Sequence, residues 1–151
     1  MRRSARQTPA DIESFSKALR SHRMKVTPQR LAVHRAMMEL VHAGADEVYA
    51  AVKESSDIPI TRSTVFNILE DMTSKGIYAR RYGPKGRMCF DVNAFRHVHL
   101  YDTRNNEFLD VDADELLLAV QTGLKRRRFK GYSIDDFDIQ IICHATRKKQ
   151  V

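Results

Sequence analysis

The 151-residue sequence predicts an α+β protein: an N-terminal winged helix-turn-helix domain followed by a small C-terminal α/β dimerisation domain. Three observations support this prediction. Helical apolar spacing recurs in four segments before residue 76, two short strand-like runs follow, and a second set of strands surrounds one further helix. We expect residues 1–92 to form the first domain, including a basic N-terminal arm, and residues 93–151 to form the second.

The first domain should contain four helices. Residues 1–10 are basic and lack apolar periodicity, so they are expected to form a flexible arm, with the first helix running from about Asp11 to Arg23. Thr27-Pro28 starts the second helix, because threonine caps a helix and proline suits its first turn. That helix should end near residues 42–44. A short third helix should have Asp46 and Glu47 in its first turn, and the fourth should run from about residues 61–63 to Lys75-Gly76.

A basic hairpin follows the fourth helix. Residues 77–82 and 87–92 alternate like strands, and the polar turn Gly83-Pro84-Lys85-Gly86 joins them. Helices followed by such a hairpin are typical of a winged helix that places its last helix in the DNA major groove. The alternative interpretation is a small helical bundle with an added hairpin. The basic residues of this region favour DNA binding.

The second domain is too small to bury both of its faces alone. The residue pattern predicts three strands, at residues 98–101, 107–111 and 134–143. It also predicts an amphipathic helix from residue 114 to about residue 128. The residues expected to be buried on that helix are Leu116, Leu117, Val120 and Leu124. We therefore expect this domain to pair with a second copy of itself, giving the two-fold symmetry that a palindromic DNA operator requires.

Charge is unevenly distributed along the chain. The net charge is +7, and residues 1–90 carry sixteen Lys and Arg against nine Asp and Glu, whereas residues 91–151 carry ten of each. The first part is thus suited to a polyanion. No apolar run has the length of a membrane span or signal-peptide core, so a cytoplasmic location is expected. Cys89 and Cys143 form no C-x-x-C pair and are expected to be buried free thiols.

A candidate metal site lies between Asp91 and Asp110. His97-Val98-His99 would place both imidazoles on the same side of a strand, because successive strand side chains alternate. Imidazoles with one or two carboxylates suit Fe(II), Mn(II) or Zn(II). The alternative is that these histidines are ordinary surface or dimer-contact residues.

Four motifs, in this order and spacing, resemble the ferric uptake regulator (Fur) superfamily of metal-dependent repressors. They are Lys25 to Arg30 (KVTPQR), His42 to Tyr49 (H-x-x-A-D-E-x-Y), Ser63 to Leu69 (STVFNIL), and Asp91 with His97-x-His99. The resemblance implies a DNA-binding homodimer that is not an enzyme. It also implies a metal site made by His42, Asp91, His97, His99 and Asp110. One ion would then bridge the two domains and couple metal binding to operator binding.

The last ligand, Asp110, resembles the peroxide-sensing (PerR) branch, whereas glutamate is commoner in the iron-sensing branch. In that branch Fe(II) reacts with peroxide and a ligating histidine is oxidised; His42 and His97 match these histidines. An iron-responsive regulator, or a haem-responsive one of the Irr branch, is the alternative. The chain departs from the family at one site: Asp102, Asn105, Ala145 and Lys148 stand where the family usually has the cysteines of a structural zinc site. We therefore expect no structural four-cysteine zinc site.

Two other classes of function stay open from the residues alone. Two histidines and a carboxylate also form the facial triad of non-haem iron oxygenases, and a metal-free DNA-binding or interaction protein is a third option. For DNA, the fourth helix offers base-facing candidates, and basic residues elsewhere offer phosphate contacts. The base-facing candidates are Arg62, Ser63, Phe66 and Asn67, and Thr64 is a further DNA-binding candidate on the same outward face. The phosphate candidates are Lys25, Arg30, Arg80 and Lys85.

Overall fold

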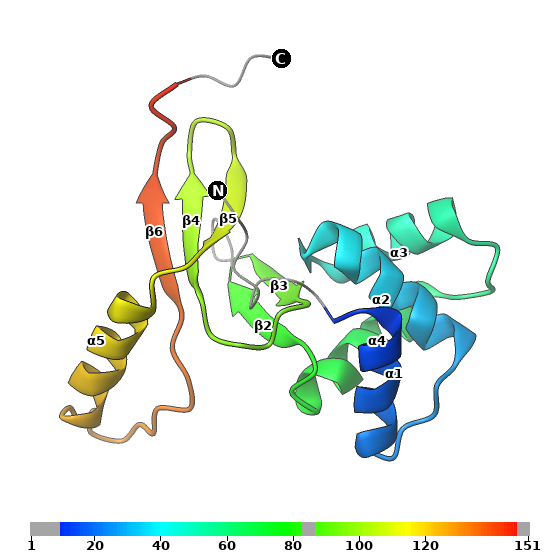
Figure 1. The fold of residues 1–151 in the computed structure, drawn as a ribbon, viewed down its shortest axis with the longest axis horizontal. Coiled ribbons are helices and arrows are strands. Elements are labelled where there is room, and N and C mark those ends of the chain that lie inside the picture. The colour runs from blue at the N-terminus through cyan, green and yellow to red at the C-terminus, as the bar shows by residue number, and fades with distance from the viewer. Residues whose placement is uncertain (1–9, 83–86, 148–151) are drawn as a thin grey trace. The chain divides into compact units, whose positions relative to one another are not determined.

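The structure, a computed structural model, describes residues 10–82 and 87–147 and confirms the mixed helix and sheet class (Figure 1). The expected arm at residues 1–9, the hairpin turn with Lys85, and Lys148 lie outside the described residues. Backbone contacts divide the molecule into two compact units, one of residues 7–95 and one built on residues 96–151. Each unit has its own three-stranded sheet.

Four helices form the bulk of the first unit. They are α1 (Ile12–Ser21), α2 (Pro28–Leu40), α3 (Ala45–Ser55) and α4 (Arg62–Ser74). Polar side chains cap three of them: Asp11 accepts a hydrogen bond from the Ser14 amide, Thr27 from Arg30, and Thr61 from Thr64. These caps explain why the helix starts are readable from sequence.

The sheet of the first unit has the order β1-β3-β2 and is antiparallel throughout. Strands β2 (Ala79–Tyr82) and β3 (Met88–Asp91) form the expected hairpin, whereas β1 (His42–Ala43) was not expected. The sequence prediction continued α2 to residues 42–44. Instead, Val41 has a φ of 63°, which redirects the chain out of the helix, and its carbonyl accepts a hydrogen bond from the Val92 amide. A positive φ is costly for a β-branched residue and cannot be read from sequence.

A buried histidine links three parts of the helical core. The His34 ring stacks on Phe15 with a centroid distance of 3.9 Å. Its Nδ1 accepts a hydrogen bond from the Tyr78 hydroxyl at 2.7 Å, and its Nε2 donates to the Ala10 carbonyl at 2.6 Å. Burial lowers the pKa of His34, so the neutral ring required by this bonding pattern is the favoured form.

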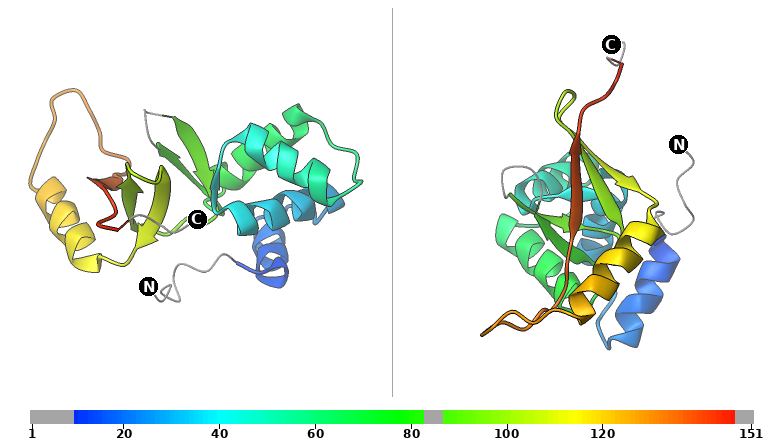
Figure 2. Two further views of the ribbon diagram at one scale, coloured as in Figure 1. Left: turned by 90° about the horizontal axis from the view of Figure 1, so that it is seen from above. Right: turned by 90° about the vertical axis from the view of Figure 1, so that its left-hand side faces the viewer.

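The second unit contains β4 (Val98–Asp102), β5 (Glu107–Val111), α5 (Asp114–Lys125) and β6 (Ile139–Cys143). Its sheet has the order β5-β4-β6, with β4 antiparallel to β5 and parallel to β6. Residues 126–138 connect α5 to β6 as a long segment, drawn in orange in Figure 2.

Four expectations for this unit are corrected by the structure. Helix α5 ends at Lys125 rather than near residue 128, and the last strand starts at Ile139 rather than Ile134. None of the α5 residues expected to be buried is buried in the single chain. Cys143, like Cys89 in the first unit, is only half-buried. The uncovered helix is the physical consequence of a unit with a single helix and three strands.

Candidate metal centre and nucleic-acid interface

Strand pairing in the second unit brings two histidines and an aspartate together. His97 directly precedes β4 and His99 is its second residue, so their side chains lie on the same face of the sheet. The antiparallel register places Asp110 of β5 directly opposite His99. Both histidines are buried, with exposed fractions of 4% and 0%.

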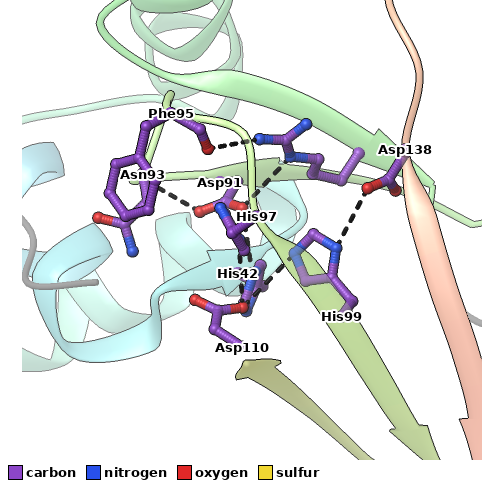
Figure 3. A network of polar contacts seen from close by, with 9 residues as sticks. His42, Asp91, Asn93, Phe95, His97, His99, Asp110 and Asp138 are labelled. Atoms are coloured by element: carbon purple, nitrogen blue, oxygen red, sulfur yellow. Dashed lines mark hydrogen bonds and ion pairs between the residues drawn. The ribbon is translucent and has the colours of Figure 1, made fainter. Parts of the chain in front are cut away.

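The polar atoms of these three side chains converge on one point. The Asp110 Oδ1 atom lies 3.3 Å from His97 Nε2 and 3.4 Å from His99 Nε2 (Figure 3). The two imidazole rings meet edge to face with a centroid distance of 4.4 Å. Nitrogen and oxygen donors in a buried cluster of this size fit a divalent transition metal, because each residue can offer one ligand atom.

The other faces of His99 are also occupied. Its Nδ1 lies 3.2 Å from the Asp138 carboxylate, and its ring stacks on Phe108 with a centroid distance of 4.6 Å. Asp138 stands immediately before β6, and Figure 3 shows it on the Nδ1 side of the ring. The His99 side chain is therefore fixed by contacts from both neighbouring strands.

In the first unit, His42 and Asp91 are paired residues of β1 and β3. His42 Nε2 lies 3.3 Å from Asp91 Oδ2, and Asp91 is fully buried. The same carboxylate contacts the Arg81 guanidinium at 3.4 Å. It also accepts a 2.9 Å hydrogen bond from the Asn93 amide (Figure 3). Arg81, itself 3% exposed, also donates to the Phe95 carbonyl. Asp91 thus has a buried cationic partner that the sequence did not indicate.

The base-facing candidates lie on the exposed side of α4. Arg62, Ser63, Phe66 and Asn67 are exposed, and Phe66 reaches 44%. Thr64 is half-buried, and its amide and hydroxyl both bond to the Thr61 cap. The exposed residues line an open hollow of about 530 Å³, together with Asp46 and Arg87. Arg62 pairs with Asp46 at 2.6 Å and lies over the Tyr49 ring.

The phosphate candidates differ in how strongly the protein itself holds them. Lys25 is exposed. The Arg30 guanidinium donates to the Lys25 carbonyl at 2.6 Å and lies 3.9 Å from Asp71. Arg80 pairs with Glu70. Of the four candidates, Lys25 is thus the described residue best suited to an external phosphate, and Lys85 lies outside the described residues.

Sequence reasoning missed Arg81 and Asp138. Arg81 appeared only as one of several basic residues of the hairpin, and Asp138 as part of a strand. No local pattern marks either residue. Asp138 reaches His99 only because β6 pairs in parallel with β4, a contact across 39 positions of the chain.

The chain thus combines a helical unit that carries an antiparallel hairpin with a strand-rich unit that carries a histidine–aspartate cluster, the combination expected of a metal-dependent DNA-binding regulator. The ferric uptake regulator family model matches residues 21–141, and this chain belongs to that family. It is a transcriptional regulator of the family and not an enzyme, which removes the oxygenase alternative. Regulators of this family bind DNA and are typically dimers.

Individual relatives are similar over most of the chain. The peroxide-responsive repressor PerR of Staphylococcus aureus is 30% identical over 108 residues, covering 70% of this chain and 72% of the relative. The peroxide stress regulator of Campylobacter jejuni has a TM-score of 0.63 at 22% identity, covering 92% and 99%. The ferric uptake regulator of Pseudomonas aeruginosa, solved with manganese, has a TM-score of 0.64 at 19% identity, covering 87% and 98%. The chain therefore falls among the PerR-like members.

Among the described residues, no helix is long and apolar enough to cross a membrane.

Proposed function

We propose that this protein is a metal-dependent repressor that senses peroxide through Fe(II), with Mn(II) and Zn(II) able to occupy the same site. The ligands that we propose are His42, Asp91, His97, His99 and Asp110. The observation that carries the proposal is the buried convergence of His97, His99 and Asp110 within the second unit. A manganese-bound structure of a relative supports a divalent ion in this fold.

The proposed ligands come from both units. His42 and Asp91 belong to the first unit, whereas His97, His99 and Asp110 belong to the second. In the proposal, residues 1–92 read DNA and residues 93–151 dimerise, so an ion shared by both would restrict their relative motion. A typical coupling of this kind is about 1–3 kcal/mol, or roughly 5- to 150-fold in affinity. The metal would favour the arrangement that fits a palindromic operator.

Asp91 differs from the other proposed ligands because its carboxylate already has several partners within the first unit. Its carboxylate already contacts the Arg81 guanidinium, the Asn93 amide and His42 Nε2. Direct ligation would require Oδ2 to exchange the Arg81 contact for the ion. If Asp91 keeps its contact with Arg81, it orients His42 instead of binding the ion. Hydrogen-bond acceptors beside metal-binding histidines commonly have this role.

The proposed DNA partner is a double-stranded operator read by a homodimer in the cytoplasm. Arg62, Ser63, Phe66 and Asn67 are proposed to face the bases. The Phe66 ring can contact a thymine methyl group, and the Asn67 amide can pair with adenine. Thr64, Lys25, Arg30, Arg80 and Lys85 are the proposed supporting and phosphate-contacting residues.

Asp110 and the similarity to two peroxide-responsive regulators support the choice of signal. Bound Fe(II) would supply the electron that splits hydrogen peroxide. The oxidant formed in this way would add an oxygen atom to an imidazole carbon of His42 or His97. Oxidation would weaken that ligand and release the operator.

Peptide mass spectrometry after peroxide treatment tests this proposal. The Fe(II)-loaded protein is compared with the Mn(II)-loaded protein, which is the control because Mn(II) does not react in this way. His97 lies in the tryptic peptide of residues 97–104, which contains no methionine. His42 lies in the peptide of residues 36–53 together with Met37 and Met38, so fragment ions must locate the added oxygen.

We expect one added oxygen on His42 or His97, and lost operator binding, only in the Fe(II) form. If both histidines stay unmodified while metal still promotes operator binding, the protein is an iron- or haem-responsive regulator instead. Titration with haem then separates these two signals.

A further inference from the structure

A short irregular segment contributes a side chain to the second unit's histidine cluster. Residues 134–138 lie between the turn after α5 and the start of β6. Asp138, the last of them, places Oδ1 3.2 Å from His99 Nδ1. The other ring nitrogen, Nε2, faces Asp110 at 3.4 Å. His99 therefore lies between two carboxylates, one at each nitrogen (Figure 3).

Two independent features hold Asp138 in this place. On its C-terminal side, Ile139 pairs with Val98 in the parallel β4–β6 ladder, which fixes the backbone beside His99. On its N-terminal side, the Arg96 guanidinium forms an ion pair with Asp136 and lies 4.1 Å from the centre of the Phe137 ring. Cation–π contacts of this geometry stabilise a side chain beside its ring. Arg96 is thus an anchor for the segment that carries Asp138.

The position of Asp138 determines which nitrogen of His99 can bind an ion. When a carboxylate accepts a hydrogen bond from Nδ1–H, the proton stays on Nδ1 and the free lone pair lies on Nε2. That nitrogen is directed at Asp110, on the other side of the ring from Asp138. Stacking on Phe108 further limits rotation of the ring. Asp138 is therefore a partner of Nδ1, whereas Nε2 is left to face Asp110.

We propose that Asp138 is a positioning residue of the metal centre, which fixes the tautomer and ring orientation of His99 so that Nε2 binds the ion. The inference rests on the proposed function, since it assumes that the cluster binds a metal. Acceptors of this kind next to ligating histidines typically change metal affinity by about 10- to 100-fold. Arg96 supports the same arrangement indirectly, by holding the Asp136–Asp138 segment.

The test compares Asp138→Ala and Asp138→Asn with the wild type in the full-length protein. Asp135→Asn is the matched control, because it removes an exposed carboxylate from the same segment. Mn(II) affinity is measured by competition with a fluorescent chelator. The His99 tautomer in the metal-free protein is read from ¹⁵N chemical shifts, a signal that a general loss of stability would not change selectively.

We expect Asp138→Ala to weaken Mn(II) binding about 10- to 100-fold and to mix the His99 tautomers, while its thermal unfolding stays cooperative. The asparagine variant keeps an oxygen acceptor at this position, so Asp138→Asn should retain the tautomer and lose less affinity. Asp135→Asn should behave as the wild type.

Wild-type Mn(II) affinity in Asp138→Ala, or an unchanged Nδ1–H tautomer, would overturn the positioning role and leave the proposed function standing. A wild-type protein that binds neither Mn(II), Fe(II) nor Zn(II) would overturn both.

Discussion

At the scale of single residues, Asp102 organises the far end of β4. Its carboxylate accepts hydrogen bonds from the Asn105 side chain at 2.6 Å and from the backbone amides of Arg104 and Ala145 at 2.9 and 3.1 Å. Asp102, Asn105 and Ala145 are three of the four positions at which the family usually has zinc-binding cysteines. One carboxylate thus joins the β4–β5 turn to the end of β6. The absence of a structural zinc stays a prediction.

The Asp102 contacts predict an acid-sensitive component of stability. The Asn105 side chain, followed by the backbone amides, lowers the pKa of Asp102 below its usual 3.8. A carboxyl whose pKa is lowered by folding stabilises the protein above its unfolded pKa, and this stabilisation is lost as the pH falls through the folded pKa. We therefore expect the free energy of unfolding to decline below pH 3.8, and to decline less steeply in Asp102→Asn. Denaturant unfolding followed at several pH values measures this slope.

Asp112→Asn, which changes an exposed carboxylate of the same unit, is the control for the Asp102 experiment. Equal acid slopes for the wild type and Asp102→Asn would show that the hydrogen bonds to Asp102 do not stabilise the folded state.

The local features of single residues were largely predictable, and their partners were not. The i, i+2 spacing of His97 and His99 is a property of sequence, and their shared face follows from strand geometry alone. The contacts of Arg81 with Asp91 and of Asp138 with His99 depend on strand register. Register is determined by the pairing of whole strands, which no single residue encodes.

At the scale of elements, α5 is the clearest incomplete structure. In the single chain it has no buried residue, although Leu116, Leu117, Val120 and Leu124 lie along one stripe. Exposed apolar surface of this kind marks an interaction site. The stripe on α5 is the surface that we expect the second subunit to cover.

Two glutamate substitutions on α5 test this assignment. Val120 lies in the apolar stripe, whereas Leu118 lies roughly 160° around the helix from it. Both side chains are exposed in the single chain, at 36% and 64%. We expect Val120→Glu to dissociate the dimer at micromolar concentration and Leu118→Glu to leave it intact. Sedimentation velocity gives the mass of each variant. Dissociation by Leu118→Glu alone would place the interface on the opposite side of α5.

Helix α4 and its basic surroundings give a second prediction at this scale. Lys25→Ala should weaken binding evenly across DNA sequences and flatten the slope of log affinity against log salt by about one, because one phosphate contact is lost. Asn67→Ala should instead change the preferred base at one operator position, at a cost of about 1–3 kcal/mol. Fluorescence anisotropy with operator variants at several salt concentrations distinguishes the two effects. Reversed behaviour would exchange the assigned roles.

The helix starts were predicted accurately from sequence where capping residues are present. Elements whose position depends on packing against distant segments were predicted less well. The starts of α1, α2 and α4 follow from their Asp11, Thr27 and Thr61 caps. Strand β1 was missed because only two residues form it, and they pair with β3 across the whole of α3 and α4. Short strands have too little periodicity to be recognised.

At the scale of the whole molecule, the proposal is that an ion shared by His42 and the second unit's ligands would make DNA binding depend on metal. We expect His42→Ala to retain Mn(II) binding by His97, His99 and Asp110 with lower affinity. We also expect it to lose the metal-induced gain in operator affinity. His99→Ala should lose both properties. Calorimetric Mn(II) titration and operator anisotropy with and without Mn(II) measure the two quantities separately. A full metal response in His42→Ala would show that the first unit contributes no essential ligand through this histidine.

The sequence by itself determined the order and type of most elements, the basic character of the first part of the chain and the residue types of the candidate metal site. It did so because capping, periodicity and charge are local properties. Only the tertiary structure decided that Asp110 pairs opposite His99 and that Arg81 forms an ion pair with Asp91. It also decided that Asp138 contacts Nδ1 of His99. These contacts arise from the register of strands that are far apart in the chain. Register depends on the packing of the complete sheet rather than on any local pattern.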